Sequence, residues 1–313
     1  MLAREAGFPE DECGIIAGAS AMTDSLTTGF RIAGNGIAVT VEPTQSWTFW
    51  RDDEDMHTWK PFHFMPGDPA KAAPRRDSAR HPGVCTANSS RAKEVLVSAL
   101  RTRNPYRIGI GLHVFADSWA HQNFVGARDR HNRRGGPIPP VGHAQFGAEP
   151  DDFNAEWVDS RLEPPHDRVT NRHRFMDAAR LIYKYLATFR RRPFEDWPLV
   201  ETGLLVALDL DGSGSEDRES RIAGLTVAYD VPGWTYNEWL TESVLVDEGM
   251  RSRLSTPAAG TRLWASEELQ QSVGRPPLVL QPAPDFGESH MAAFLDAASE
   301  HRKVALEAIR NPA

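Results

Sequence analysis

Cysteine is nearly absent from this chain of 313 residues, which contains only Cys13 and Cys85. Two cysteines cannot form a disulfide framework or supply a cysteine-based zinc site. The sequence also lacks any apolar run close to the 18 or so residues that a membrane-spanning helix requires. Because the first residues lack the apolar segment of a signal peptide, we expect a cytoplasmic protein without a transmembrane segment.

An excess of basic residues is absent as well. The chain has 35 lysine and arginine residues against 43 aspartate and glutamate residues, which gives a formal net charge of −8. A broad basic surface for duplex nucleic acid is therefore not expected, although a small anionic substrate is not excluded. Since thiolates are so few, any bound metal has to be held by histidine, aspartate and glutamate.

What the sequence does contain is a regular ladder of metal-ligating residue types. His113, Asp117 and His121 recur every fourth residue within an apolar segment. Positions four residues apart lie on one face of an α-helix and rise about 6 Å per step. His113 and Asp117 can thus bind one metal ion while Asp117 and His121 reach a second, with the carboxylate as a bridge. The alternative is a hydrogen-bonded structural stripe, but burying these groups without a counter-charge is costly.

Local signals predict where the helix carrying this ladder begins and ends. Asn104 and Pro105 supply an N-cap and a first-turn proline, and Gly126 is the predicted stop. Apolar side chains around most of the circumference indicate a helix that is buried on several sides. Gly109 and Gly111 each weaken a helix by about 1 kcal/mol relative to alanine, a cost that indicates close packing against another backbone.

Helical patterns dominate the rest of the chain. Beyond the ladder, the expected helices span 9–24, 90–103, 170–190, 198–208, 236–250 and 288–309. Two short strands, 30–33 and 37–41, are expected around Gly34-Asn35-Gly36, whereas the rest of 25–60 is predicted to be irregular. Residues 65–88 are interpreted as a surface loop. The sequence therefore predicts a mainly α fold with long loops and a short β hairpin.

No linker in the sequence forces a domain boundary. We expect a metal-site helical domain over 1–195 and a helical C-terminal extension over 196–313, packed on the same core. A group of aromatic residues either lines an apolar cleft or packs in the core, and packing is the commoner case. These residues are Trp47, Phe49, Trp50 and Trp59.

Four segments together resemble a known superfamily. They are the His-x3-Asp-x3-His helix, the segment Ile16 to Asp24, Pro61-Phe62-His63-Phe64 and Gly142-His143-Ala144. In order and spacing they resemble the metal-binding segments of the zinc-dependent phospholipase C and fungal single-strand nuclease superfamily, and more closely those of its bacterial relatives of unassigned function. The resemblance covers roughly residues 1–190 and implies a helical domain of the phospholipase C type.

The resemblance also implies a cluster of two or more zinc ions, with manganese or iron as other candidates. The ligands implied for one metal are Asp24, His63, His113 and Asp117. Those implied for a neighbouring metal include His121 and His143. Phospholipases follow the later histidine with a glutamate one helical turn on, but position 147 is glycine here. We therefore expect Glu149 or Asp151 to take that place.

The activity implied by the resemblance is hydrolysis of a phosphoester by a metal-activated water, with Asp24 and Asp117 as catalytic carboxylates. Basic residues near the ladder are candidates to hold a small-molecule or lipid-like anionic substrate. They are Arg128, Arg130, Arg133 and Arg134. Two alternatives stay open: a non-catalytic helical binding protein that metals only stabilise and, more distant, a di-iron oxygenase.

Overall fold

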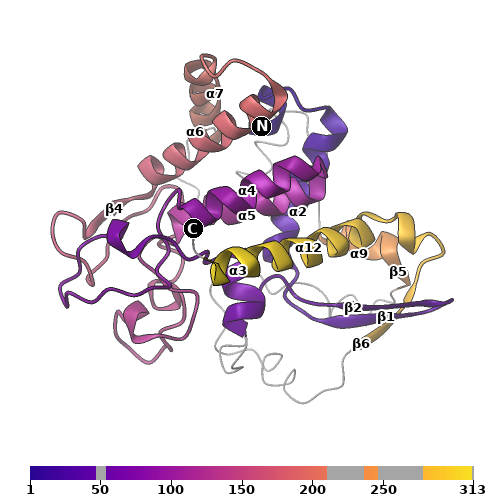
Figure 1. The fold of residues 1–313 in the computed structure, drawn as a ribbon, viewed down its shortest axis with the longest axis horizontal. Coiled ribbons are helices and arrows are strands. Elements are labelled where there is room, and N and C mark those ends of the chain that lie inside the picture. The colour runs from indigo at the N-terminus through magenta and orange to yellow at the C-terminus, as the bar shows by residue number, and fades with distance from the viewer. Residues whose placement is uncertain (47–53, 210–235, 246–277, 312–313) are drawn as a thin grey trace.

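The computed structural model describes residues 1–46, 54–209, 236–245 and 278–311, and its regular structure is mainly α-helical (Figure 1). The α-helices are α1 Leu2–Glu5, α2 Glu10–Ser25, α3 Lys60–Phe62, α4 Ser90–Thr102, α5 Pro105–Ala120, α6 Asn171–Arg190, α7 Trp197–Asp209, α9 Tyr236–Ser243 and α12 His290–Arg310. Short 3-10 turns lie at Pro69–Lys71, Arg130–Asn132, Ala144–Phe146 and Phe286–Glu288. The mainly α fold predicted from the sequence is confirmed.

Two small sheets accompany the helices. The strands are β1 Phe30–Gly34, β2 Ile37–Val41, β3 Glu156–Val158, β4 Arg168–Thr170, β5 Val244–Leu245 and β6 Leu278–Pro282. The predicted hairpin is confirmed as β1 and β2, which pair antiparallel from Phe30 opposite Val41 to Gly34 opposite Ile37. The sheet has the order β2-β1-β6-β5, with β6 parallel to β1, while β3 and β4 form a separate hairpin. The parallel pairing joins segments that lie far apart in the sequence.

Helix α5, which carries the ladder, is the central helix of the fold. It begins after the predicted N-cap Asn104 and packs against α2, α4, α6 and α12 (Figure 1). A Cβ atom on Gly109 would lie 2.4 Å from the Ile16 carbonyl oxygen of α2, and one on Gly111 would lie 2.8 Å from the Ala99 Cβ atom of α4. Both glycines therefore permit close helix contacts, as the sequence predicted.

The predicted end of this helix is wrong, because α5 ends at Ala120 and not at Gly126. One cause is Arg174, whose Nη1 donates hydrogen bonds to the carbonyl oxygens of Trp119, at 2.9 Å, and Ala120, at 3.3 Å. A guanidinium group thus satisfies carbonyls at the helix end. A second cause is Asn123, which adopts the left-handed conformation with φ 66°. The chain after α5 therefore turns away from the helix axis.

Five other predicted helices, α2, α4, α6, α7 and α12, agree with the structure to within two residues at each end. The helix predicted over 236–250 ends at Ser243 instead, because the chain continues into β5 and pairs with β6. Residues 246–250 lie outside the described part of the chain. The expectation of irregular structure is wrong for residues 55–60, which form the π-helical turn Asp55–Trp59 and the start of α3. Carbonyl groups of this segment accept hydrogen bonds from α12, a contact that local sequence does not reveal.

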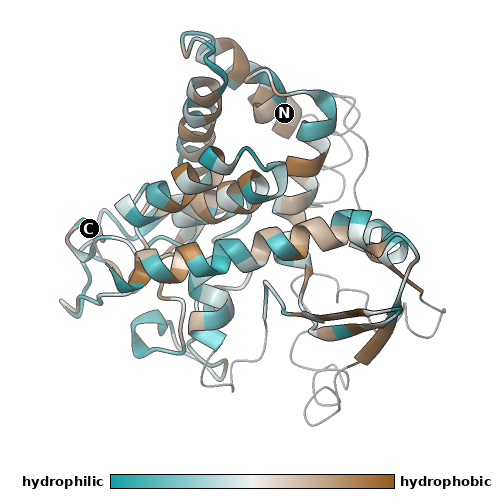
Figure 2. Ribbon diagram, turned by 45° about the vertical axis from the view of Figure 1, so that its right-hand side comes forward, coloured by the Kyte–Doolittle hydropathy of each residue, from teal (hydrophilic) through white to brown (hydrophobic). Residues whose placement is uncertain are grey.

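The last helix contributes to two buried apolar clusters. Ala305 and Ala308 of α12 belong to the cluster formed with α1, α2, α4, α5, α6 and α7. Met291 and Phe294 belong to the cluster formed with the four-stranded sheet, whose strands are drawn mostly in hydrophobic colours in Figure 2. α12 therefore joins the first part of the chain to the sheet.

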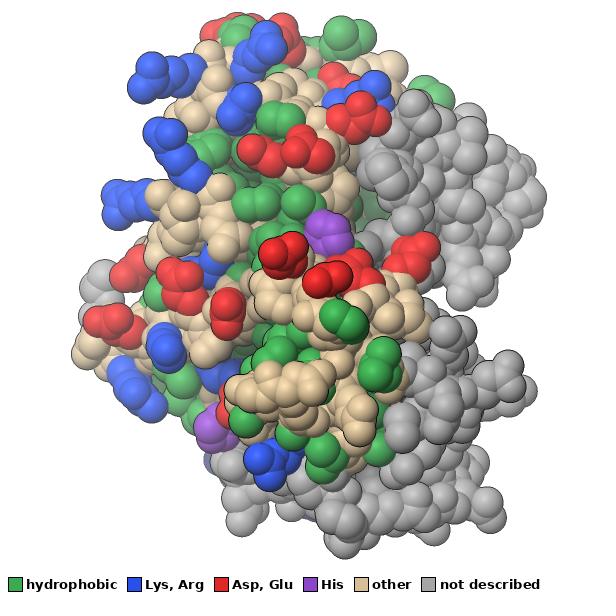
Figure 3. Space-filling view, turned by 90° about the vertical axis from the view of Figure 1, so that its right-hand side faces the viewer, with side chains coloured by type: hydrophobic (Ala, Val, Ile, Leu, Met, Phe, Trp, Pro, Cys, Tyr) green, Lys and Arg blue, Asp and Glu red, His purple; other side chains and the backbone are tan. Residues whose placement is uncertain are grey.

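Of the aromatic group singled out in the sequence, Trp59 is buried, and it packs with Phe64, Phe124 and Trp157. Trp47, Phe49 and Trp50 lie outside the described residues. Among the helices that the structure describes, none is both long enough and apolar enough to cross a bilayer. Side chains of both charge signs gather on the face shown in Figure 3.

Candidate metal centre

The first cluster consists of Asp24, His63, His113 and Asp117. Asp24 lies in the last turn of α2, His63 directly follows α3, and the other two lie one turn apart on α5. His63 Nδ1 is 3.1 Å from Asp117 Oδ2 and 3.7 Å from Asp24 Oδ1. His113 Nε2 is 3.3 Å and 3.7 Å from the same two oxygens, and the two nitrogens are 3.2 Å apart.

These separations match those of ligands around one ion. Nitrogen and oxygen ligands lie about 2.0–2.2 Å from zinc in a tetrahedral site, which places neighbouring ligand atoms about 3.3–3.5 Å apart. The observed range of 3.1 Å to 3.7 Å brackets that value. The donor set, two imidazoles and two carboxylates, suits zinc and also manganese or iron. The residues predicted from the resemblance therefore fit a metal at this position.

The second cluster consists of His121, His143 and Asp151, whose ligand atoms all lie within 4.8 Å of one another. His121 follows the last residue of α5, His143 precedes the 3-10 turn Ala144–Phe146, and Asp151 lies in the loop before β3. The Nε2 atoms of His121 and His143 are 3.4 Å and 3.3 Å from the oxygens of Asp151. The Asp151 side chain is 49% exposed, so this cluster opens to solvent.

Backbone carbonyl groups fix the orientation of three of the four histidine rings. His63 Nε2 donates to the Thr44 carbonyl oxygen at 2.9 Å, His121 Nδ1 donates to the carbonyl oxygen of His63 at 2.8 Å, and His143 Nδ1 donates to that of Gly147 at 3.0 Å. A carbonyl oxygen can only accept, so these nitrogens carry the proton. In a neutral ring the other nitrogen is then a lone pair, and in each case it faces a carboxylate. A metal ion between the two groups, or a second proton on that nitrogen, stabilises this arrangement, and a carbonyl partner on the other ring nitrogen is typical of metal-ligating histidines.

Without a metal, the carboxylates shift the pKa values of the histidines. Burial alone would lower the pKa of His113 and of His121, but nearby carboxylates together outweigh it, Asp117 with Asp24 for the first and Asp117 with Asp151 for the second, and both values are raised to about 9. Burial would raise the pKa of Asp117, whereas the two histidines hold it well below its ordinary range. For His143, burial outweighs the attraction of Asp151 and lowers the pKa. Asp117 is therefore ionised at neutral pH, which is the form that binds metals.

The structure selects between the two acidic residues expected for the second cluster, and it places Asp117 in the first cluster. Glu149 Oε2 accepts a hydrogen bond from Arg134 Nη1 at 2.5 Å, so Asp151 and not Glu149 joins the second cluster. Asp117 Oδ2 belongs to the first cluster and lies 3.7 Å from His121 Nδ1, a nitrogen that already donates to a carbonyl group. A bridge from Asp117 to a second metal stays a prediction.

The predicted substrate-binding arginines lie in the loop beside the second cluster. Arg128, Arg130 and Arg133 are exposed, and Arg134 lies over the ring of Phe146 with 4.7 Å between its guanidinium carbon and the ring centroid. Arg128 pairs through its backbone with Val141, close to His143 in the sequence. The loop is thus near the second cluster, and its contact with a substrate stays a prediction.

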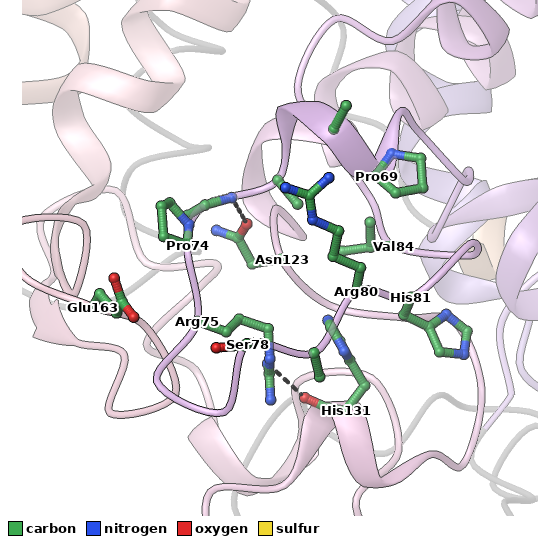
Figure 4. A pocket seen from close by; sticks show the side chains of 14 residues that line it. Pro69, Pro74, Arg75, Ser78, Arg80, His81, Val84, Asn123, His131 and Glu163 are labelled. Carbon is green, nitrogen blue, oxygen red and sulfur yellow. Dashed lines mark hydrogen bonds between the residues drawn. The ribbon is translucent and has the colours of Figure 1, made fainter.

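A cavity of about 300 Å³ lies between residues of the segment 69–84, Asn123, His131 and Glu163, and Figure 4 shows it at close range. Its lining includes Arg80, His81, Asn123 and His131 but no residue of either cluster. His131 is 5% exposed, and burial, followed by neighbouring arginines, lowers its pKa to about 4. This histidine therefore stands apart from the metal centre.

Sequence reasoning missed the side chains that hold the ligand-bearing loops. Asn171 and Arg174 of α6 and His301 and Arg302 of α12 donate hydrogen bonds to backbone carbonyl groups near the ligands. Their backbone partners lie between 19 and 259 residues away, so no local pattern identifies them.

Comparison with known proteins gives one match. Neither a curated protein nor a solved structure matches the chain. One family model matches residues 1–309, a span that includes every residue of both clusters. The family is described only as one of unknown function, so the match assigns no activity and no cofactor. By this match, the chain belongs to DUF6765, a family of unknown function.

Proposed function

We propose that the protein is a metal-dependent hydrolase that cleaves a phosphoester with a metal-activated water. The observation that carries the proposal is the first cluster, in which the imidazole nitrogens of His63 and His113 lie 3.1–3.7 Å from each other and from carboxylate oxygens of Asp24 and Asp117. The second cluster supports it, because a histidine pair and a carboxylate with one open side can accept a further ion. The resemblance to the zinc-dependent phospholipase C superfamily supports a phosphoester as the substrate class.

The exposure of two carboxylates favours catalysis over a purely structural role. Structural metal sites are closed, whereas catalytic sites keep a position open to water or substrate. The Asp24 side chain is 36% exposed and that of Asp151 is 49% exposed, so solvent reaches one side of each cluster. Bound divalent ions would supply Lewis acidity that lowers the pKa of water toward neutrality and stabilises charge on a phosphoryl oxygen.

The chain's own residues have separate tasks in this proposal. The Asp24 carboxylate, exposed at the edge of the first cluster, accepts the proton of the attacking water. Asp117 is less exposed, at 17%, and keeps His63 and His113 in place. The exposed arginines of the loop 128–134 attract an anionic substrate, which is a small or lipid-like phosphoester.

The test compares the metal content and the activity of the wild-type protein with those of Asp117→Asn. We expect at least two equivalents of zinc in protein purified without added metal or a histidine tag, and turnover of a chromogenic phosphodiester. Asp117→Asn should lose metal and turnover together, since it weakens a group that contacts both histidines. The exposed substitution Asp177→Asn on α6 is the control and should change neither.

The other possible outcomes would contradict the proposal or favour a different function for this protein. Full activity in metal-free protein would refute the proposal. Bound metal without turnover of any phosphoester would favour the non-catalytic, metal-stabilised binding protein. Two equivalents of iron with consumption of oxygen would favour the oxygenase.

A further inference from the structure

His63 and Asp151 are ligands that come from irregular segments. His63 follows the three-residue helix α3, and Asp151 lies in a loop between a 3-10 turn and β3. A ligand has to be held within about 0.5 Å of its productive position, which helix geometry alone does not provide here. Other contacts must therefore fix these two backbones.

We propose that two pairs of polar side chains are positioning residues, one pair for each metal cluster. His301 and Arg302 of α12 position His63 in the first cluster. Asn171 and Arg174 of α6 position Asp151 in the second. The inference rests on the proposed metal binding and deepens it, because it says which parts of the fold make each site.

The first pair holds the segment that ends at His63. His301 Nε2 donates to the Pro61 carbonyl oxygen at 3.0 Å, and Arg302 Nε donates to that of His57 at 2.9 Å. His301 is fully buried, and its Nδ1 accepts a hydrogen bond from Arg107 Nη1 at 2.6 Å. Since a guanidinium group can only donate, this contact keeps the proton of His301 on Nε2, where the Pro61 carbonyl needs it.

Arg302 also reaches the backbone that orients the His63 ring. Its Nη2 donates to the Pro43 carbonyl oxygen at 3.1 Å. The carbonyl group of the next residue, Thr44, accepts the hydrogen bond from His63 Nε2. The Arg302 guanidinium group therefore holds two segments, the one that ends at His63 and the one that contains Thr44. The hydrogen bond to Thr44 in turn leaves His63 Nδ1 facing the first cluster.

In the second pair, Asn171 holds the loop on both sides of Asp151. Its Nδ2 donates to the carbonyl oxygens of Glu149, at 2.6 Å, and Asp152, at 2.5 Å. Its Oδ1 accepts from Trp157 Nε1 at 3.0 Å, which sets the orientation of the amide. Asn171 is fully buried, so these bonds are shielded from water.

Arg174 joins that loop to the end of α5. Its Nη2 donates to the Pro150 carbonyl oxygen at 3.1 Å, and its Nη1 donates to the carbonyl groups of Trp119 and Ala120. His121 is the next residue. Arg174 therefore fixes the backbone next to His121 and next to Asp151, and so the distance between these two ligands, without being a ligand itself.

The two pairs lie on different helices and hold different segments, so each should affect its own cluster. Asn171→Asp keeps the side-chain shape and the acceptor for Trp157 but removes both donors to the loop. Arg302→Met keeps an apolar stem over Phe62 but removes its donors to Pro43 and His57. Loss of a partner that orients a metal ligand weakens binding by about 10–100-fold.

The experiment is a zinc titration of the full chain against a competing chelator, which resolves the affinity of each bound ion. Asn171→Asp should weaken one ion about 10–100-fold and leave the other within about twofold, and Arg302→Met should do the reverse. The exposed substitutions Asp177→Asn on α6 and Lys303→Gln on α12 are matched controls and should change neither affinity. Direct ligand variants identify the ions. Asn171→Asp added to Asp151→Asn should have no further effect, whereas Arg302→Met added to it should weaken the remaining ion, that of the first cluster, about 10–100-fold.

A merely structural role would give a different result. If each variant weakened both ions equally, in proportion to its loss of thermal stability in chelator, the positioning roles would be wrong. Unchanged affinities would overturn them as well. Should Arg302→Met not fold, Arg302→Lys retains the charge without the planar fork and should still weaken only the ion of the first cluster. Absence of metal from the wild-type protein would instead contradict the proposed function.

Discussion

The two metal clusters use the same residue types but are built in different ways. In the first cluster, Asp24, His113 and Asp117 lie on packed helices, and the His63 side chain is 2% exposed. In the second cluster, the ligands follow or lie outside the helices, and the Asp151 side chain is 49% exposed. Helix packing therefore places three of the four ligands of the first cluster, and only His63 depends on hydrogen bonds to its segment, whereas the second cluster depends mainly on hydrogen bonds to a loop. Different perturbations should break each one.

The largest expected effect is the pH dependence of the metal-free protein. The pKa values of His113 and His121 are about 9 in the folded state against 6.5 in an unfolded chain. A raised pKa contributes stability that is fully present below pH 6.5 and is lost as the pH rises toward 9. The free energy of unfolding in chelator should therefore fall by on the order of 3 kcal/mol between these pH values.

Urea unfolding at pH 6.5, 7.5 and 9 measures this effect. With excess zinc the slope should reverse, because protons compete with the metal for the same nitrogens. His113→Gln should remove part of the slope seen in chelator, whereas His143→Gln should not, since the pKa of His143 is lowered in the folded state. Equal stability of the chelated wild-type protein at pH 6.5 and pH 9 would contradict the charge pairing.

A second prediction concerns helix packing around the first cluster. A Cβ atom at position 109 would lie 2.4 Å from the Ile16 carbonyl oxygen and 2.8 Å from the Ala19 Cβ atom, so Gly109→Ala has to displace α2 and with it Asp24. We expect a loss of about 1–3 kcal/mol in the free energy of unfolding. Zinc affinity should fall at the first cluster and stay unchanged at the second.

The matched control is Gly14→Ala on α2, where a Cβ atom meets nothing within 4 Å. This substitution should stabilise the protein by about 0.4–1 kcal/mol and leave both zinc affinities unchanged. Urea unfolding combined with a zinc titration gives both values. If Gly109→Ala weakened both clusters to the same extent, the distinction between packed and loop-held ligands would be lost.

The smallest expected effect on stability concerns Arg134 beside the second cluster. Its ion pair with Glu149 is partly exposed, so Arg134→Gln should change the free energy of unfolding by less than about 1 kcal/mol. Both zinc affinities should stay unchanged. If the loop contacts an anionic substrate, KM should rise about fivefold with kcat unchanged, as expected for a lost contact of about 1 kcal/mol. Steady-state kinetics against Arg101→Gln, exposed on α4, would show whether the effect is specific to this loop.

Much of the fold could be predicted because its signals are local. The start of α5 follows from Asn104, whose side chain accepts hydrogen bonds from the backbone N–H groups of Tyr106 and Arg107. The β1–β2 hairpin follows from the glycine-rich turn between its strands. The end of α5 could not be predicted, because Arg174 caps it from more than 50 residues away.

The candidate site could likewise be predicted in part from the sequence. The helical ladder and the resemblance together named six residues that the structure brings into the two clusters, Asp24, His63, His113, Asp117, His121 and His143. They could not decide between Glu149 and Asp151, since only the fold brings Asp151 within 3.4 Å of His121 and His143 while Glu149 pairs with Arg134. A sequence motif indicates candidate ligands, whereas tertiary contacts between distant segments determine which of them come together.

The contact between α12 and the segment before His63 also has a consequence for folding during synthesis on the ribosome. The hydrogen bond from His301 to Pro61 closes a loop of 240 residues. At about 5–20 residues per second, the ribosome needs about 12–48 s to synthesise the stretch between them. The other ligands of the first cluster, Asp24, His113 and Asp117, also precede α12 in the chain, on α2 and α5. The backbone that carries His63 is thus held by a helix that is synthesised after every residue of the two clusters.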